Sequence, residues 1–300
     1  MSKPAGKPKP TGTTSRIIVK TAPRRKGPPL ALVVGAAAVV VVGVMVAVKL
    51  FARPAAPAAS GPVPAAVLSA VESLPISEAG SIGAGSAQGT FAHLKGPALV
   101  GPSGLPRVLY MGAEYCPFCA SERWAVVVAL GRFGRFQNLG LSESATDDIY
   151  PGTPTFTFHG ASYKSEYVDF KAVEMQTNVK VNGQYAPLEK PDPSEIALLQ
   201  KYDAPPYVPA GAAGSIPFID IGNRFVFSGS SFPPDLLAGK SWTTIATRLS
   251  DPTSAEARAI VGAADVLTGA ICIVTSGKPA EVCQAPAIQI IQQTTLASPH

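Results

Sequence analysis

Two cysteines separated by two residues lie between a predicted strand and a predicted helix, and this arrangement constrains the fold more than any other sequence feature. Residues 107–112 have the apolar, β-branched and aromatic pattern of a buried strand. The motif Cys-Pro-Phe-Cys, residues 116–119, follows after a short loop. Residues 120–133 then have a helical pattern that Gly134 closes. The order predicts a domain of α/β class with both sulfur atoms near a helix N-terminus.

Two thiols at this spacing can act in turn on a disulfide. One sulfur attacks as a thiolate, and the other resolves the mixed disulfide within the same chain. Helix N-terminal amides stabilise an anion and lower the pKa of a thiol there below its free value of about 8.5. We expect Cys116 to be the exposed attacking sulfur and Cys119 the inner, resolving one. The same helix carries Glu122 and Arg123, which we expect on its solvated face.

Two other interpretations of the pair stay open. A zinc half-site would need four ligands, and His93, His159, His300 and the remaining cysteines lie without close spacing. A purely structural disulfide would be unusual here, because a bond across so short a loop is more easily reduced than structural disulfides usually are. We therefore expect a redox dithiol, with no metal and no bound cofactor.

A β-hairpin is the strongest signal in the second half of the chain. Two apolar runs, residues 215–221 and 224–229, are joined by Gly222-Asn223, a dipeptide typical of tight hairpin turns. The other predicted elements are strands at 155–159 and 167–175, a helix at 193–202, and two helices within 242–275 that Pro252 divides and whose second member Ser254 caps.

The strand, the dithiol and its helix, followed about a hundred residues later by Ser215-Ile216-Pro217 at the start of the hairpin, resemble the thioredoxin superfamily. The resemblance implies a thioredoxin-like fold, a cis bond before Pro217, and packing of Pro217 beside Cys116 and Cys119. It also implies that Ile216 and Tyr115 contact the substrate. Without the dithiol, Ile216-Pro217 would be interpreted as an ordinary trans strand start.

Two features depart from ordinary thioredoxins. Tyr115 stands where thioredoxins carry Trp, and the spacing from the dithiol to Pro217 is much longer. The longer spacing implies an insertion between the two halves of the fold. This insertion has strand patterns, whereas the insertion in disulfide oxidants of the bacterial periplasm is helical.

A longer stretch is similar to a narrower family. Residues 110–124, with 131–134 and 150–155, resemble an uncharacterised thioredoxin-like family of archaea and actinobacteria that is described only as a domain of unknown function. The likeness extends over about 106–283. It implies a fold but no activity.

Cys272 and Cys283 form a second candidate pair, with a Gly-Lys-Pro turn between them. A disulfide closing so short a loop would contribute about 2–3 kcal/mol through chain entropy. We expect a structural disulfide between the last helix and the tail. The alternative is a second redox pair that relays electrons to Cys116.

The first fifty residues have the composition of a membrane anchor. Residues 30–48 carry no charged or strongly polar side chain and would span about 28 Å as a helix, close to the thickness of a bilayer core. Basic residues are more numerous before this run than after it, which predicts a cytoplasmic N-terminus. A cleaved signal peptide is the alternative, although its apolar core is usually shorter.

These patterns divide the chain into four parts. We expect a basic cytoplasmic tail at 1–29, one transmembrane anchor at 30–51, a Pro/Ala/Gly-rich linker at 52–105, and a thioredoxin-like domain at 106–300. All four cysteines follow the anchor, on the extracytoplasmic side, where disulfides can form and persist.

The net charge of +5 comes from the tail, because residues 1–29 hold eight of the 25 Lys and Arg residues and none of the 20 Asp and Glu residues. The remaining 17 basic residues are outnumbered by the acidic ones, so we expect no nucleic-acid partner. We expect a single-pass membrane protein that exchanges disulfides in exported protein substrates and has a redox partner in the membrane. The alternative is a non-enzymatic extracytoplasmic binding module with structural disulfides.

Overall fold

The computed structural model describes residues 61–76, 81–88 and 90–297. Contacts within the chain define two units, residues 1–54 and 55–300, and every described residue belongs to the second. The predicted basic tail and transmembrane anchor lie outside the described residues.

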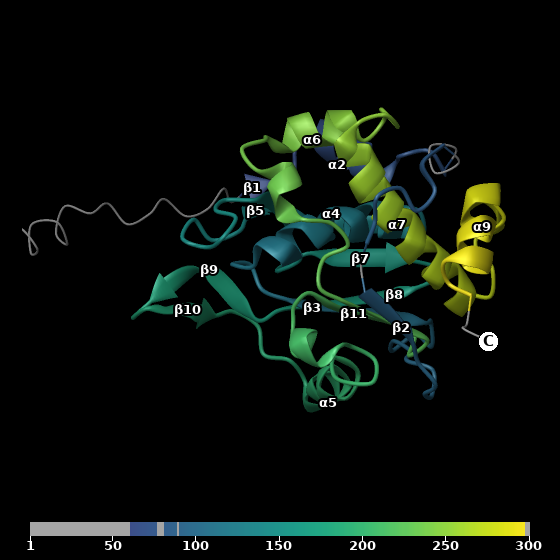
Figure 1. Cartoon of the computed structure of the whole chain (residues 1–300), viewed down its shortest axis with the longest axis horizontal. Helices are drawn as coiled ribbons and strands as arrows, with labels where there is room; N and C mark the ends of the chain where they lie inside the picture. Colours follow the sequence, from purple (N-terminus) through teal and green to yellow (C-terminus); the bar gives the residue numbers. More distant parts are fainter. Residues whose placement is uncertain (1–60, 77–80, 89, 298–300) are drawn as a thin grey trace, which may run out of the picture. The chain divides into compact units, whose positions relative to one another are not determined.

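A five-stranded sheet forms the centre of the described unit (Figure 1). Strands β3 and β8 run parallel, whereas β11 pairs antiparallel with both β3 and β12, and β12 pairs antiparallel with β2. The strand order is β2 (Thr90–His93), β12 (Phe225–Ser228), β11 (Phe218–Ile221), β3 (Arg107–Gly112) and β8 (Asp169–Glu174). Because β8 is the last strand in this order, one of its two edges carries no neighbouring strand of the sheet.

Helices cover both faces of this sheet. Side chains alternate between the two faces of a strand. Val108 and Tyr110 of β3 therefore join the larger core with α4 (Pro117–Gly131) and α7 (Ala255–Val274), while Leu109 and Met111 join a smaller core with α5 (Pro193–Tyr202). The remaining helices are α2 (Ala65–Glu72), α6 (Trp242–Arg248), α8 (Ala280–Cys283) and α9 (Pro286–Thr294). The structure is of mixed α/β class, as the sequence predicts.

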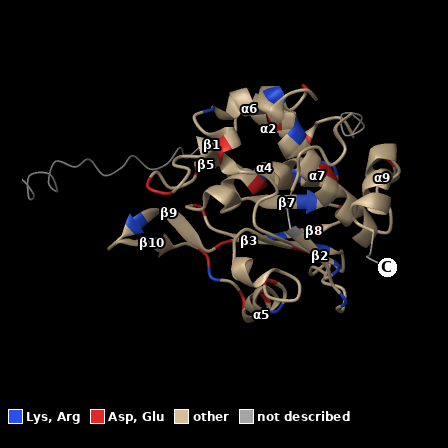
Figure 2. Cartoon of the chain, viewed as in Figure 1, with Lys and Arg blue, Asp and Glu red and all other residues tan. Residues whose placement is uncertain are grey.

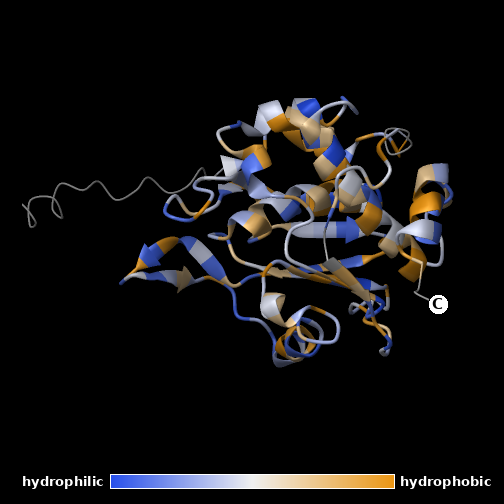
Figure 3. Ribbon diagram, in the orientation of Figure 1, coloured by the Kyte–Doolittle hydropathy of each residue, from blue (hydrophilic) through white to orange (hydrophobic). Residues whose placement is uncertain are grey.

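The helix α7 is the one described helix long and apolar enough to cross a membrane. Of its most apolar window, 83% is buried inside the protein, and it contacts both α4 and α9 (Figure 3). This burial is typical of a core helix. Lys and Arg residues are interspersed with Asp and Glu residues over the described elements (Figure 2).

Most of the chain between α4 and α5 forms short strands, in agreement with the strand patterns there. They make three small sheets and leave the hairpin β9–β10 projecting beside the dithiol end of α4 (Figure 1). The strands are β4 (Gly134–Gln137), β5 (Gly140–Glu143), β6 (Pro154–Thr157), β7 (Ser162–Ser165), β9 (Gln176–Val181) and β10 (Gln184–Pro187). The strand β1 (Gly61–Pro62) pairs with β5.

The linker expected over 52–105 ends much earlier than expected. Val67 and Val71 of α2 are buried in the main core, and β2 is a strand of the central sheet. The helix α2 corresponds to the one short helical pattern in this segment, at about 63–74, whereas β2 has too few apolar residues to stand out from the Pro/Ala/Gly/Ser composition. The folded unit therefore includes residues well before the expected start at 106.

The predicted hairpin is confirmed as β11 and β12. Gly222 and Asn223 have φ values of +63° and +53°, the left-handed conformation that a two-residue hairpin turn requires. The helix predicted at 193–202 and the two helices divided at Pro252 are also confirmed. The Ser254 hydroxyl caps α7 by accepting the Ala257 N–H at 3.0 Å.

Candidate functional site

Cys116 is the N-cap residue of α4. Its sulfur accepts a hydrogen bond from the Cys119 backbone N–H at 3.2 Å, one of the donors that a helix start leaves without a helical partner. Pro117 occupies the first helical turn, where its missing N–H costs no hydrogen bond. The helix start therefore offers the Cys116 sulfur a hydrogen-bond donor and the positive end of the helix dipole.

The segment before β11 lies directly against this sulfur. Cys116 Sγ is 3.7 Å from the carbonyl oxygen of Ile216, and the Ile216–Pro217 peptide bond is cis. The sheet register explains the contact, because Phe218, the first residue of β11, pairs with Met111 near the end of β3. The structure thus brings together Cys116, Cys119 and the Ile216-Pro217 loop, about a hundred residues apart in sequence.

The expected exposure of Cys116 is wrong. The residue is only 5% exposed, and Cys119 is fully buried. Two segments of the insertion contact the residues on either side of Cys116 in sequence. The Tyr115 ring stacks on the Tyr185 ring of the hairpin β9–β10 with centroids 4.1 Å apart, and Phe118 lies edge-on to Tyr150. The sequence does not show that the insertion contacts the residues next to the dithiol.

The two thiols differ in their electrostatic surroundings. The pKa of Cys116 is lowered, first by the hydrogen bond with Cys119 and further by backbone N–H groups and the Arg123 charge, against the opposing effect of burial. Burial raises the pKa of Cys119 well above the ordinary value of a thiol, and the neighbouring Cys116 adds to this shift. Of the two thiols, Cys116 is therefore the one on which the anion is favoured, which corresponds to the predicted division of roles.

An ion pair lies buried behind the dithiol. Arg123 is four residues after Cys119 and therefore on the same side of α4. Its guanidinium donates to both carboxylate oxygens of Glu174, at 2.8 and 2.6 Å, and to the carbonyl oxygen of Ala113 at 2.9 Å. Because Ala113 also accepts the Cys116 N–H, Arg123 helps to hold the loop that carries Cys116.

The expectation that Glu122 and Arg123 are solvated is also wrong. Their exposed fractions are 1% and 0%. The helix α4 contacts α2, α7 and β6, so it has almost no face open to water. Glu122 accepts hydrogen bonds from the Ser231 N–H at 2.7 Å and the Ser231 hydroxyl at 3.0 Å. Burial raises its pKa to about 7.

A second carboxylate lies in the loop before Cys116. Glu114 accepts hydrogen bonds from the hydroxyl groups of Ser142 and Thr157, both at 2.5 Å, and its backbone N–H donates to the carbonyl oxygen of Gln176. These bonds attach the dithiol loop to β5, β6 and β9. Glu114 could not be identified from the sequence, because its hydrogen-bond partners come from strands far along the chain and no local pattern indicates them.

Cys272 and Cys283 are joined by a disulfide, whereas Cys116 and Cys119 are free thiols. The disulfide connects the last turn of α7 to α8. Val274, close to Cys272 in sequence, lies beside Gly222. The Gly222 N–H donates to the carbonyl oxygen of Arg107 at the start of β3. Cys116 follows the opposite end of that strand. The two pairs therefore lie toward opposite ends of β3, an arrangement that favours a structural over a relay role for the disulfide.

Comparison with protein families shows where this chain belongs. Residues 96–273 match the model of a domain of unknown function, DUF929, which covers more than half of the chain. The chain belongs to the DUF929 family. No curated protein and no solved structure matches it. The DUF929 match contains the dithiol, the Ile216-Pro217 loop and Cys272, and it ends before Cys283.

Proposed function

We propose that this DUF929 chain is an extracytoplasmic thiol–disulfide oxidoreductase of the thioredoxin superfamily, acting on exported proteins through Cys116 and Cys119. The observation that carries the proposal is the position of the Cys116 sulfur at a helix N-terminus, 3.7 Å from the carbonyl oxygen of Ile216. The helix N-terminus stabilises the thiolate, and the Ile216 segment beside the sulfur can contact an incoming chain.

The exchange uses the two sulfur atoms in turn. The Cys116 thiolate attacks one sulfur of a substrate disulfide, forming a mixed disulfide and releasing the other substrate sulfur as a thiolate. Cys119, after losing its proton, attacks Cys116, which forms the Cys116–Cys119 disulfide and releases the reduced substrate. The same steps in reverse transfer a disulfide to a substrate dithiol.

Formation of the mixed disulfide prepares the second step. The neighbouring Cys116 contributes to the raised pKa of Cys119, whereas the Arg123 charge lowers it. Once Cys116 is bonded to substrate it carries no negative charge, and that part of the effect disappears. The Cys119 proton is then lost more readily, and Arg123 continues to favour the anion.

The sheet supports the superfamily assignment. The dithiol follows the parallel strand β3, and the antiparallel hairpin β11–β12 begins directly after the loop that contacts it. Helices α4 and α7 lie on one face and α5 on the other. The strand-rich insertion between α4 and α5 accounts for the long spacing between Cys119 and Pro217.

The proposed location follows from the sequence. An anchor at 30–51 would hold the domain at the outer side of the cell membrane, with exported proteins as substrates and a membrane protein as redox partner. A disulfide between Cys272 and Cys283 is compatible with an oxidising compartment.

Trapping of mixed disulfides tests the proposal. Cys119→Ala should accumulate exported proteins on Cys116 in the native host, because the resolving thiol is absent. Cys116→Ala with Cys119→Ala is the matched control and should trap none. Absence of trapped proteins, together with a Cys116–Cys119 potential below about −300 mV in a redox titration, would instead support a binding module with a structural disulfide.

A further inference from the structure

The strand β8 leaves part of its backbone open at the edge of the central sheet. Asp169 and Met175 donate their N–H groups to Pro106 and Gly112 on the β3 side, at 2.9 and 2.8 Å. Alternate residues of a strand direct their backbone groups to opposite edges. Phe170 and Ala172 therefore direct their N–H and C=O groups outward, where no other strand of the described chain pairs with them.

The chain itself pairs with this edge over a short distance. The Leu188 and Glu189 N–H groups donate to the carbonyl oxygens of Met175 and Glu174, both at 3.0 Å, so the chain runs antiparallel to the end of β8 without forming a regular strand pair. The Glu189 carboxylate also accepts the Glu174 N–H at 2.8 Å. The chain then turns away into α5, which begins at Pro193. The edge can thus accept an antiparallel segment, and its part from Ala172 to Phe170 stays open.

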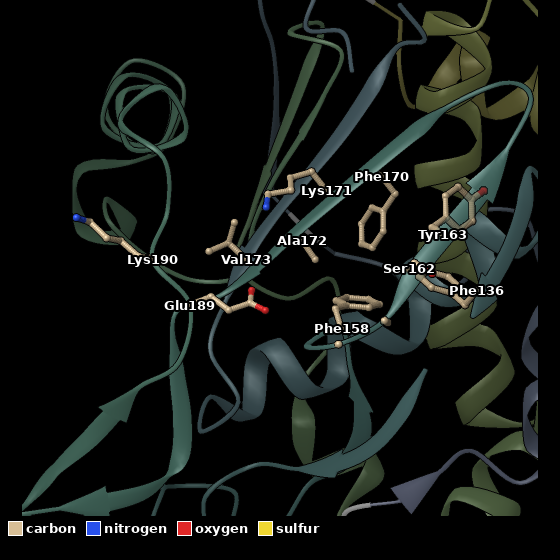
Figure 4. Close-up of a pocket in the computed structure, with 12 residues that line it drawn as sticks. Phe136, Phe158, Ser162, Tyr163, Phe170, Lys171, Ala172, Val173, Glu189 and Lys190 are labelled. Atoms are coloured by element: carbon tan, nitrogen blue, oxygen red, sulfur yellow. The ribbon is translucent and has the colours of Figure 1, made fainter. Parts of the chain in front are cut away.

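A cavity of about 390 Å³ lies beside the open part of the edge. One side is lined by four aromatic rings, those of Phe136, Phe158, Tyr163 and Phe170 (Figure 4). Lys171 extends from the opposite side of the strand, Glu189 also lines the cavity, and the side chain of Lys190 points away from the rings (Figure 4). Neither lysine forms an ion pair within the described residues.

We propose that the β8 edge binds an extended peptide of a partner protein as an added antiparallel strand. Adjacent residues of an extended chain point to opposite faces. One bulky apolar side chain would therefore enter the ring-lined cavity, while its neighbours would point toward Lys171. Unpaired Lys171 favours an acidic neighbour, because the nearby Glu189 carboxylate is already bonded to His159 and to the Glu174 N–H. The motif is an aromatic residue flanked by acidic residues, and its binding does not depend on the dithiol chemistry.

A synthetic peptide that alternates Glu and Phe is the direct probe. It carries a fluorescent label, and its anisotropy is followed as the full-length chain in lipid nanodiscs is added. We expect saturable binding. Methylation of the peptide amides that face β8 should weaken binding at least about tenfold, since main-chain hydrogen bonds supply the affinity in strand addition. Equal binding of the methylated peptide would indicate a cavity for apolar ligands and overturn the proposal.

Two protein variants separate backbone pairing from charge. Ala172→Pro removes an outward N–H and leaves the β3 side of the ladder intact, and it should abolish peptide binding. Lys171→Glu should weaken binding of the Glu/Phe peptide and strengthen that of a Lys/Phe peptide, each by up to about fivefold. Lys95→Glu, an exposed lysine at the end of β2, is the matched charge control and should change neither.

If Ala172→Pro does not fold, the charge exchange at Lys171 still decides the result. An unchanged preference for the acidic peptide in Lys171→Glu would overturn the assignment of this surface. Trapping of substrates on Cys116 should be unaffected in Lys171→Glu, so failure of this proposal is distinguishable from failure of the proposed oxidoreductase.

Discussion

The Cys116 sulfur combines a low exposure with surroundings that favour the thiolate. Hydrogen bonds from Cys119 and the helix start lower its pKa, while burial acts in the opposite direction. The stabilising groups prevail because they are close and fixed by the helix. Local hydrogen bonding therefore favours the thiolate at this residue in spite of its burial.

The pH dependence of alkylation tests this description of Cys116. In the reduced chain, the iodoacetamide rate at Cys116 should rise with pH through a midpoint below the free-thiol value of about 8.5. Cys119 should stay unreactive over the same range, because burial raises its pKa. Mass spectrometry of the labelled peptides measures both rates. Equal, slow labelling of the two thiols would indicate an inert pair.

Glu122 should make stability depend on pH. Its pKa is raised to about 7 in the folded chain, so the folded state holds the proton more tightly than the unfolded state. Stability is then lost as the pH rises from about 4.5 to about 7. The Glu122 carboxyl should lower the free energy of unfolding by about 3 kcal/mol over this window, and Glu122→Gln should abolish that decrease. Urea unfolding at pH 5 and pH 8 measures it, with Glu281→Gln, an exposed site, as the control.

If Glu281→Gln changed the pH dependence of stability as much as Glu122→Gln does, this role for Glu122 would be contradicted. Buried Asp220, with a pKa of about 7, and Asp265, with a pKa of about 6, contribute with the same sign in all three proteins. Comparison of variants, and not the absolute slope, therefore isolates the Glu122 carboxyl.

At the scale of elements, the hairpin β9–β10 contacts the residue before the dithiol through Tyr185. The Tyr185 ring stacks on Tyr115, and Lys180 Nζ lies 4.7 Å from the Tyr185 ring centroid. Asp147 bonds both Lys180 and the Tyr185 hydroxyl. Tyr185→Ala should increase the alkylation rate of Cys116 about two- to tenfold, equivalent to the 0.5–1.5 kcal/mol of an aromatic pair. Val179→Ala, an exposed position of the same hairpin, should leave the rate unchanged.

The Cys272–Cys283 disulfide should stabilise the end of α7. It closes a loop with a sequence separation of 11, so the double variant Cys272→Ser with Cys283→Ser should lose about 2–3 kcal/mol. The corresponding decrease in Tm is about 5–10 °C. Differential scanning fluorimetry measures it. A reductant should lower the Tm of the wild type by a similar amount and leave the variant unchanged, and a large effect on the variant would implicate another bond.

At the scale of the whole molecule, membrane topology remains a prediction from the sequence. A reporter that is active only outside the cytoplasm, fused after Phe51, should be active and should sediment with membranes, because basic residues are concentrated before the apolar run. Exchange of the basic residues before and after the run should reduce the activity. Recovery of the fusion as a shortened soluble protein would indicate a cleaved signal peptide.

Much of the fold follows from local patterns in the sequence. The strand at 107–112, the Gly222-Asn223 hairpin and the Ser254 cap are specified by residues close to one another in the chain. The partners of Arg123 and Glu122 could not be predicted, because Glu174 and Ser231 reach α4 from other elements. The contact of Cys116 with the Ile216 carbonyl oxygen likewise joins segments about a hundred residues apart.

In the proposed enzyme, the burial of Cys116 would restrict which disulfides can react, because the residue is only 5% exposed. A disulfide inside a rigid, folded domain could not bring its sulfur within bonding distance without displacing residues around Cys116. A disulfide on a flexible strand or a chain terminus would adapt to the site more easily. The proposed enzyme would therefore discriminate among disulfides by the mobility of the polypeptide around them, which favours newly exported chains over mature proteins.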